Sequence, residues 1–208
     1  MDHGKKTDDA QTGSRRQFIK TTATLAGGAV ATRALVRPPA VYAAGSDTLK
    51  VGLIGCGGRG TGAAKQALLA DKNVKLTAMA DAFEDRLAFS LKALAANDEL
   101  AGKIDVPTEQ RFVGFDAYKQ VLATDVDVVL LTTPPHFRPI HLKAAVEAEK
   151  HIFAEKPVAV DAPGVRSVLE SCAEAKRKQL SLVSGLCLRY DAGFRETVRR
   201  LHDGAIQR

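Results

Sequence analysis

Residues 49–60 read Leu49-Lys50-Val51-Gly52-Leu53-Ile54-Gly55-Cys56-Gly57-Gly58-Arg59-Gly60. The first six predict an apolar β-strand, and the Ala- and Leu-rich run at 63–69 predicts a helix after the turn. The glycines follow the pattern G-x-G-x-x-G, and an acidic residue, Asp81, comes about 20 positions further on. A glycine turn alone would also fit a purely structural loop. The strand, the helix and the later acid together predict a dinucleotide-binding turn.

Each glycine of this turn has an expected task. Gly55 permits the tight turn, Gly57 lets the backbone approach a pyrophosphate, and Gly60 lets helix and strand pack closely. The unpaired N–H groups at the start of the helix would face the phosphates. The predicted cofactor is NAD, with NADP as the alternative. The other members of the turn are expected at the cofactor site as well: Cys56, Gly58 and Arg59.

Strand and helix patterns alternate along the rest of the chain, with short connections. The predicted strands are 74–80, 110–113, 126–131, 151–154 and 180–186. The predicted helices are 84–96, 115–123, 137–149, 163–178 and 193–202. Such alternation favours right-handed βαβ units and a parallel sheet. The expected fold class is therefore α/β, a doubly wound parallel sheet of the NAD(P)-binding Rossmann type, over residues 44–190.

The N-terminal 43 residues have the pattern of an export signal. Residues 14–20 read Ser-Arg-Arg-Gln-Phe-Ile-Lys and closely resemble the twin-arginine motif S-R-R-x-F-L-K. A weakly apolar stretch at 21–34, too short and glycine-rich for a stable membrane span, precedes small residues suited to signal peptidase. We therefore expect residues 1–43 to be a disordered N-terminus and signal peptide. The twin-arginine export machinery would then deliver the protein to the periplasm or another extracytoplasmic location.

A basic arm that binds nucleic acid is the alternative for this N-terminus, but charge argues against it. The 208 residues have a formal net charge of +6. Residues 1–43 hold seven of the 30 Lys and Arg but three of the 24 Asp and Glu, so the remainder has a charge of +2. So small a charge does not indicate a nucleic-acid partner.

The three cysteines, Cys56, Cys172 and Cys187, show no metal-ligand spacing, so no metal site is expected. Cys56 lies inside the glycine turn, and Cys187 is expected in an apolar strand. Both are expected to be small buried hydrophobes.

Ligands of a doubly wound sheet bind beyond the carboxyl ends of its strands, so residues after each predicted strand are candidates. Asp81 follows the second strand, where its carboxylate could accept hydrogen bonds from the adenosine ribose. It would repel a 2′-phosphate, which favours NAD over NADP, although Arg59 and Arg86 soften that repulsion. The alternative is an Asp that caps the next helix.

The fourth predicted strand is followed by Thr132-Thr133-Pro134-Pro135-His136. Two prolines fix an extended turn, so the Thr hydroxyls and the His136 ring could face the nicotinamide ribose or the substrate. A structural His is the alternative.

The fifth predicted strand is followed by Glu155-Lys156-Pro157. A Lys at the mouth of a parallel sheet is expected to be partly desolvated and to donate a hydrogen bond to a sugar hydroxyl. Pro157 would make the backbone rigid and could hold a cis bond. An ordinary Glu–Lys surface pair is the alternative.

Together these pieces resemble the Gfo/Idh/MocA oxidoreductases, the family of glucose-fructose oxidoreductase and inositol dehydrogenase. The matching motifs are Gly55-x-Gly57-x-x-Gly60, Ala80-Asp81 with Arg86, Thr133-Pro134 with His136, and Glu155-Lys156-Pro157. The resemblance covers roughly residues 49–208. It implies a Rossmann domain that binds NAD or NADP, a second sheet domain, and hydride transfer at a sugar or cyclitol carbon. Lys156 matches the family lysine that assists proton transfer from the substrate hydroxyl, and Glu155 matches the acid near the nicotinamide.

The chain departs from the family pattern in two places. Arg138 stands where the family often has a second His. The second, α+β domain that the resemblance implies is expected to be largely absent. Residues 191–208 are then expected to begin the connection to it, and the chain as written is expected to turn over poorly. A homo-oligomer is an option for a full-length form. Two alternative functions stay open: an NAD-dependent glycosidase of the same fold, and a catalytically incomplete dinucleotide-binding fragment.

Overall fold

The computed structural model describes residues 48–206, so the predicted export signal at 1–43 lies outside the described residues. Within 48–206 a six-stranded sheet has the order β3-β2-β1-β4-β5-β6, with every neighbouring pair parallel. The predicted α/β class with a doubly wound parallel sheet is confirmed. The strands are β1 (Leu49–Ile54), β2 (Val74–Asp81), β3 (Arg111–Val113), β4 (Val128–Leu131), β5 (His151–Ala154) and β6 (Leu182–Ser184).

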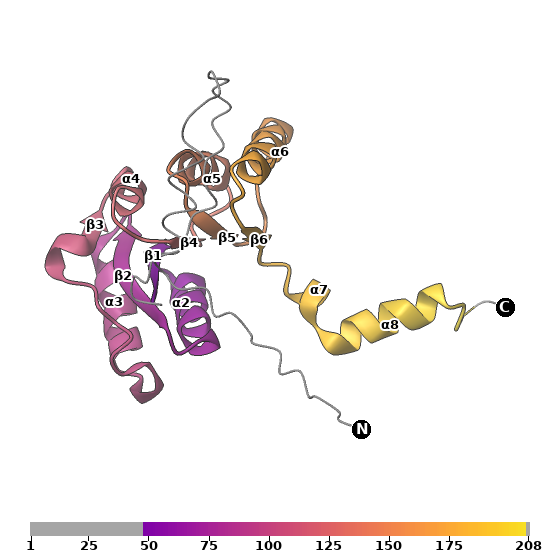
Figure 1. The fold of residues 1–208 in the computed structure, drawn as a ribbon, viewed down its shortest axis with the longest axis horizontal. Coiled ribbons are helices and arrows are strands. Elements are labelled where there is room, and N and C mark those ends of the chain that lie inside the picture. Colours follow the sequence, from indigo (N-terminus) through magenta and orange to yellow (C-terminus); the bar gives the residue numbers. More distant parts are fainter. Residues whose placement is uncertain (1–47, 207–208) are drawn as a thin grey trace, which may run out of the picture. The chain divides into compact units, whose positions relative to one another are not determined.

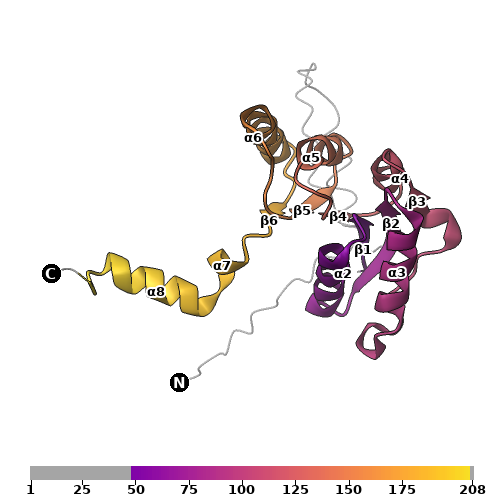
Figure 2. The same cartoon turned by 180° about the vertical axis from the view of Figure 1, so that it is seen from behind.

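Helices cover both faces of this sheet (Figures 1 and 2). One layer holds α2 (Gly58–Ala70) and α3 (Glu84–Ala95); the other holds α4 (Ala117–Leu122), α5 (Arg138–Glu147) and α6 (Ala162–Arg177). Successive strand residues point to opposite faces, so Leu53 joins the core under α2 and Ile54 joins the core under α5. After β6 come α7 (Cys187–Tyr190) and α8 (Ala192–His202), while 3₁₀ turns η1 (Asp98–Leu100) and η2 (Thr108–Gln110) lie before β3.

The strand order reverses beside β1, and this reversal positions the site. From β1 the chain proceeds to β2 and β3 on one side, then returns to β4 and continues to β5 and β6 on the other. Backbone hydrogen bonds extend the ladder one residue past the strands: Gly55 N to Ala80 O (2.8 Å), Thr132 N to Ile54 O (2.9 Å) and Glu155 N to Leu131 O (3.0 Å). The loops that follow four central strands therefore meet at one edge of the sheet, at its switch point.

Two elements differ most in extent from the sequence prediction. The helix after the glycine turn begins at Gly58, inside the turn, and not at residue 63. The last strand is shorter than 180–186, because only Leu182–Ser184 pair with β5. Cys187 consequently begins α7 and is exposed, so its prediction as a buried hydrophobe is wrong. Cys56 is buried as predicted.

Between residues 48 and 206, no helix combines the length and the apolar character needed to cross a membrane. The same part of the chain contains no cluster of three or more His, Cys, Asp or Glu that could hold a metal ion.

His141 fastens the loop after β4 to the core. Its ring is buried in α5, lies 4.2 Å from the Tyr118 ring of α4, and its Nδ1 is 3.2 Å from the Thr133 hydroxyl. Burial, followed by the nearby positive charge of Arg138, lowers the pKa of His141 to about 4. The neutral imidazole is therefore the form that the native structure holds.

This depressed pKa predicts how the stability of the protein depends on pH. Between pH 7 and pH 5 the unfolded chain protonates this His while the folded chain does not, so stability falls as the pH falls. We expect the group to account for about 2 kcal/mol of that loss, which His141→Gln should abolish. Urea unfolding of both proteins at the two pH values measures the difference. His136→Gln, at an exposed ring, is the matched control, and an unchanged pH dependence in His141→Gln would contradict the assignment.

Candidate functional site

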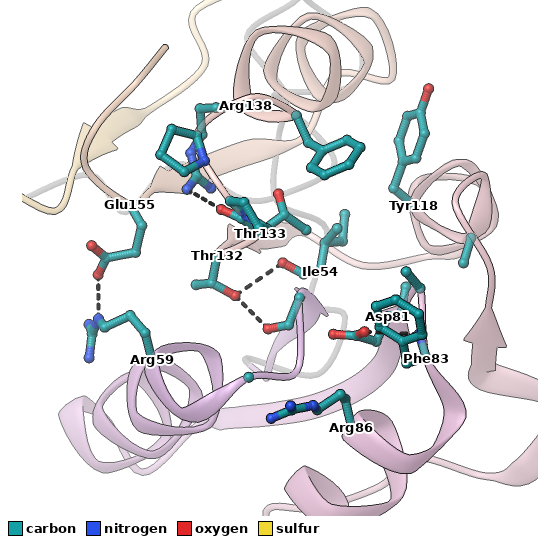
Figure 3. A pocket seen from close by; sticks show the side chains of 18 of the residues that line it. Ile54, Arg59, Asp81, Phe83, Arg86, Tyr118, Thr132, Thr133, Arg138 and Glu155 are labelled. Atoms are coloured by element: carbon teal, nitrogen blue, oxygen red, sulfur yellow. Dashed lines mark hydrogen bonds and ion pairs between the residues drawn. The ribbon is translucent and has the colours of Figure 1, made fainter. Parts of the chain in front are cut away.

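A cavity of about 530 Å³ lies over the carboxyl ends of β1, β2, β4 and β5, within the size range of ligand pockets. Its wall is formed by the loops that follow these strands and β3, with the first turn of α2 and the start of α5 (Figure 3). It includes most of the predicted cofactor residues: Gly55, Gly57, Gly58, Arg59, Asp81, Arg86, Thr132, Thr133, Pro134 and Glu155. The predicted catalytic Lys156 also lines it.

The glycines of the turn divide into two pairs. Gly55 has φ +100°, and a side chain at Gly60 would collide with the carbonyl oxygen of Gly55, so both are required by close packing. By contrast, a Cβ at Gly57 or at Gly58 would meet no atom within 4 Å. Because both line the cavity, this empty space gives a ligand direct access to the backbone.

The same place is the N-terminus of α2, a helix of 13 residues. Gly57 is its N-cap residue and makes no side-chain cap, so the first-turn N–H groups open toward the cavity without competition from a capping side chain. A helix N-terminus carries partial positive charge and suits a phosphate. The residues present therefore fit the pyrophosphate of a dinucleotide.

Asp81 lies at one end of the cavity and is fixed by the backbone. Its Oδ2 accepts a hydrogen bond from Cys56 N at 2.6 Å, and its Oδ1 accepts one from Phe83 N at 3.0 Å. Helix α3 begins after Phe83 and has no side-chain cap, which rules out the helix-cap alternative. A carboxylate has about four acceptor positions, so lone pairs remain for the hydroxyls of a ribose.

Cys56 and Gly60 are not among the cavity-lining residues of the described chain. Cys56 contributes its backbone N–H to Asp81, while its thiol lies in the core 3.4 Å from Ala80 O. Burial raises the pKa of that thiol, so the group stays protonated. Cys56 and Gly60 therefore stabilise the conformation of the glycine turn without lining the cavity.

Aromatic side chains that the sequence analysis did not single out surround the Asp81 end: Phe83, Phe115, Tyr118 and Phe137. Phe83 and Phe115 are 60% and 68% exposed, unusual for such large apolar groups. Phe115 and Phe137 stack with ring centroids 6.1 Å apart. Their sequence positions could have identified Phe83 and Phe115, because both closely follow the carboxyl ends of strands, β2 and β3. Flat apolar surfaces of this kind can hold a purine ring.

The loop after β4 is braced to the glycine turn. The Thr132 hydroxyl lies 2.6 Å from Gly55 O and 3.1 Å from Ile54 O, so its proton is shared with the protein backbone. The Thr133 hydroxyl contacts His141, as described above. Both threonines line the cavity, but in this structure their hydroxyls hydrogen-bond to groups of the protein itself.

His136 is exposed, and within the described residues it is not part of the cavity wall. The geometry therefore gives its predicted catalytic role no support.

Arg138 is a further residue whose role the sequence did not reveal. It is 1% exposed, and its guanidinium donates to the carbonyl oxygens of Leu131 and, at 2.6 Å, of Thr133. Burial lowers the pKa of Arg138. The residue holds the carboxyl end of β4 and the start of α5 in one conformation at the cavity wall.

An ion pair closes the other end of the cavity. Arg59 Nε, in the first turn of α2, lies 2.6 Å from Oε1 of the buried Glu155, at the end of β5 (Figure 3). Lys156 N lies 3.2 Å from the other oxygen of that carboxylate. The Lys156–Pro157 bond is cis. Lys156 is exposed, so the structure gives the expected partial desolvation no support.

Comparison with known proteins agrees with this geometry. Residues 49–183 match the Gfo/Idh/MocA oxidoreductase family, described by its NAD-binding Rossmann fold. Inositol 2-dehydrogenase 3 of Saccharopolyspora erythraea is 30% identical over 161 residues, and inositol 2-dehydrogenase of Rhizobium meliloti is 32% identical over 159 residues. Each alignment covers 76% of this chain and 42% of the relative, so the chain spans about two fifths of their length.

Solved structures give the same picture. A putative myo-inositol dehydrogenase from Sinorhizobium meliloti superposes with a TM-score of 0.56 at 28% identity, covering 77% of this chain and 43% of that one. The 3-ketoreductase KijD10 from Actinomadura kijaniata, in complex with TDP-benzene and NADP, has a TM-score of 0.58 at 26% identity, with 76% and 45% covered. The chain therefore belongs to the Gfo/Idh/MocA family of oxidoreductases and carries its NAD-binding Rossmann fold.

Proposed function

We propose that this chain provides the dinucleotide site of an NAD(P)-dependent oxidoreductase that transfers hydride to or from a hydroxyl-bearing carbon of a cyclitol or sugar. The observation that carries the proposal is the open backbone at Gly57 and Gly58, at the N-terminus of α2 and inside the same cavity as Asp81. The substrate class rests on relatives that are inositol dehydrogenases.

The cavity suggests how a dinucleotide would lie. Its pyrophosphate fits against Gly57 and Gly58, where the helix end provides N–H donors. The adenosine fits the end with Asp81 and the exposed aromatic rings, because the carboxylate accepts from ribose hydroxyls and the rings flank a purine. This leaves the end with Glu155 and Lys156 for the nicotinamide.

NAD suits the Asp81 end better than NADP, because a 2′-phosphate would meet the carboxylate. Arg86 lines the same end and is exposed, which keeps NADP as an alternative. A relative of the same fold is described with NADP bound.

In the proposed reaction, the bound dinucleotide supplies the hydride acceptor or donor. Lys156 lines the cavity and is exposed, so its ammonium group could donate a hydrogen bond to a ligand that approaches from solvent. There it would hydrogen-bond the reacting oxygen of the substrate and hold or release the proton that accompanies hydride transfer. Glu155 would position the Lys156 backbone through its hydrogen bond to Lys156 N.

A side chain at Gly57 tests this proposal. Gly57→Val should fill the empty space over the α2 N-terminus and weaken NAD binding at least tenfold, while the thermal midpoint stays close to that of the original chain, since nothing surrounds that Cβ. Isothermal titration with NAD measures the affinity. Gly193→Val, in the first turn of α8 and outside the cavity, is the matched control. Equal NAD affinity in Gly57→Val and the original chain would remove the cofactor assignment.

We further propose that the protein is exported by the twin-arginine machinery, on the strength of the Ser14–Lys20 motif. Replacing Arg15 and Arg16 together by Lys keeps the charge and removes the motif. The variant should accumulate in the cytoplasmic fraction of a bacterium that carries this machinery, whereas the original chain should reach the periplasm. Immunoblots of fractionated cells measure this, and the same distribution for both would contradict export.

A further inference from the structure

Glu155 places a negative charge in a restricted space at the nicotinamide end of the proposed site. It is 6% exposed, and its carboxylate contacts Arg59 Nε (2.6 Å) and Lys156 N (3.2 Å). Gly185, after β6, packs so closely that a Cβ there would lie 2.9 Å from the carboxyl carbon. A buried charge is costly unless it is paired, and Arg59 is the cation that pairs with it.

The two acids that line the cavity stand at opposite ends of it. Among its wall residues within 48–206, only Asp81 and Glu155 are acidic, and Figure 3 places the Arg59–Glu155 pair across the glycine turn from Asp81 and Phe83. Three positive groups lie at the Glu155 end: Arg59, the buried Arg138 and the exposed Lys156. Glu155 is thus the one acidic wall residue of this end, and Arg59 is its direct counter-charge.

A fixed charge at this end of the cavity interacts with the nicotinamide ring, whose own charge depends on the redox state of the cofactor. The nicotinamide ring is positively charged when oxidised and neutral when reduced, whereas the rest of the dinucleotide is the same in both. A fixed charge near the ring therefore changes the ratio of the two affinities. At an effective dielectric constant of about 20, unit charges about 12 Å apart change an equilibrium constant roughly tenfold.

We propose that the Arg59–Glu155 pair sets the preference of the site for the oxidised or the reduced cofactor. Glu155 favours the oxidised ring and Arg59 opposes it, so the two residues determine specificity with opposite signs. Arg59 is only partly covered, with 48% of its side chain exposed, so it can be replaced without opening the core. This inference rests on the proposed function, because it requires the nicotinamide to occupy the Glu155 end.

The test compares dissociation constants for NAD⁺, NADH and ADP-ribose at low salt, where screening is weakest. The intrinsic fluorescence of NADH reports its binding directly, and the other two ligands compete with it. ADP-ribose lacks the nicotinamide ring and reports changes at the pyrophosphate. The variants are Glu155→Gln, Arg59→Met and the double variant, with Arg86→Met as a matched loss of positive charge at the other end of the cavity.

We expect Glu155→Gln to reduce the preference for NAD⁺ over NADH about fivefold and Arg59→Met to raise it by a similar factor. The double variant should return close to the original ratio. Arg86→Met should leave the ratio of the NAD⁺ and NADH dissociation constants unchanged, even if the variant binds both nucleotides less tightly. Arg59→Lys, which restores the charge, should recover the original ratio.

Each outcome distinguishes this inference from the function on which it rests. The inference fails, and the cofactor site stands, if Glu155→Gln and Arg59→Met both leave the ratio of the NAD⁺ and NADH dissociation constants unchanged. It fails in the same way if the two variants move that ratio in the same direction. If the original chain binds none of the three ligands, the proposed function and the inference both fail. Should Glu155→Gln fail to fold, Arg59→Met and Arg59→Lys still decide the question, because they alter the partly exposed partner.

Discussion

The crossing of β1 and α2 at Gly55 and Gly60 is the constraint on which the site depends. A side chain at Gly60 would collide with the carbonyl oxygen of Gly55, and that oxygen also lies 2.6 Å from the Thr132 hydroxyl. One carbonyl group therefore connects the first strand, the first helix and the loop after β4. The contact brings the N-terminus of α2 to the switch point of the sheet, where a helix end can face an anion.

Charged residues keep this edge of the sheet in register around the cavity. Asp81 joins β2 to the glycine turn through Cys56 N, Arg138 holds the end of β4 through two carbonyls, and Glu155 joins β5 to α2 through Arg59. Each uses hydrogen bonds that involve a charged group, which are stronger than neutral ones. The carboxyl edge of the sheet is therefore held mainly by polar contacts, while the two apolar cores lie under the helices.

The fold could be predicted because its signals are local. Apolar runs mark the strands, and the alternation with helices fixes a parallel sheet, whose carboxyl ends converge on one edge whatever the details of packing. The sequence pattern puts the start of α2 too late because glycine has low helix propensity, and here the tertiary contact at Gly60 overrides that propensity. Residues 180–186 are predicted as one strand, but only Leu182–Ser184 pair in register with β5.

The sequence predicts where the site lies, but it does not predict which of its side chains contact one another. Parallel-sheet geometry identifies the residues after each strand, which is why Asp81, Glu155 and Lys156 all line the cavity. The pairing of Arg59 with Glu155 joins residues 96 positions apart, and nothing in their neighbouring sequence indicates it. The same holds for the burial of Arg138, a residue type that usually remains at the surface.

The three thiols of this chain differ sharply in their access to solvent. Cys56 is buried behind the glycine turn, Cys172 is half-buried in α6, and burial raises the pKa of both. Cys187 is exposed at the start of α7 and shares a groove with Arg59, Glu155 and Lys156. An alkylating dye would therefore attach first at Cys187, and its emission would report on occupancy of the neighbouring cleft without any engineered label.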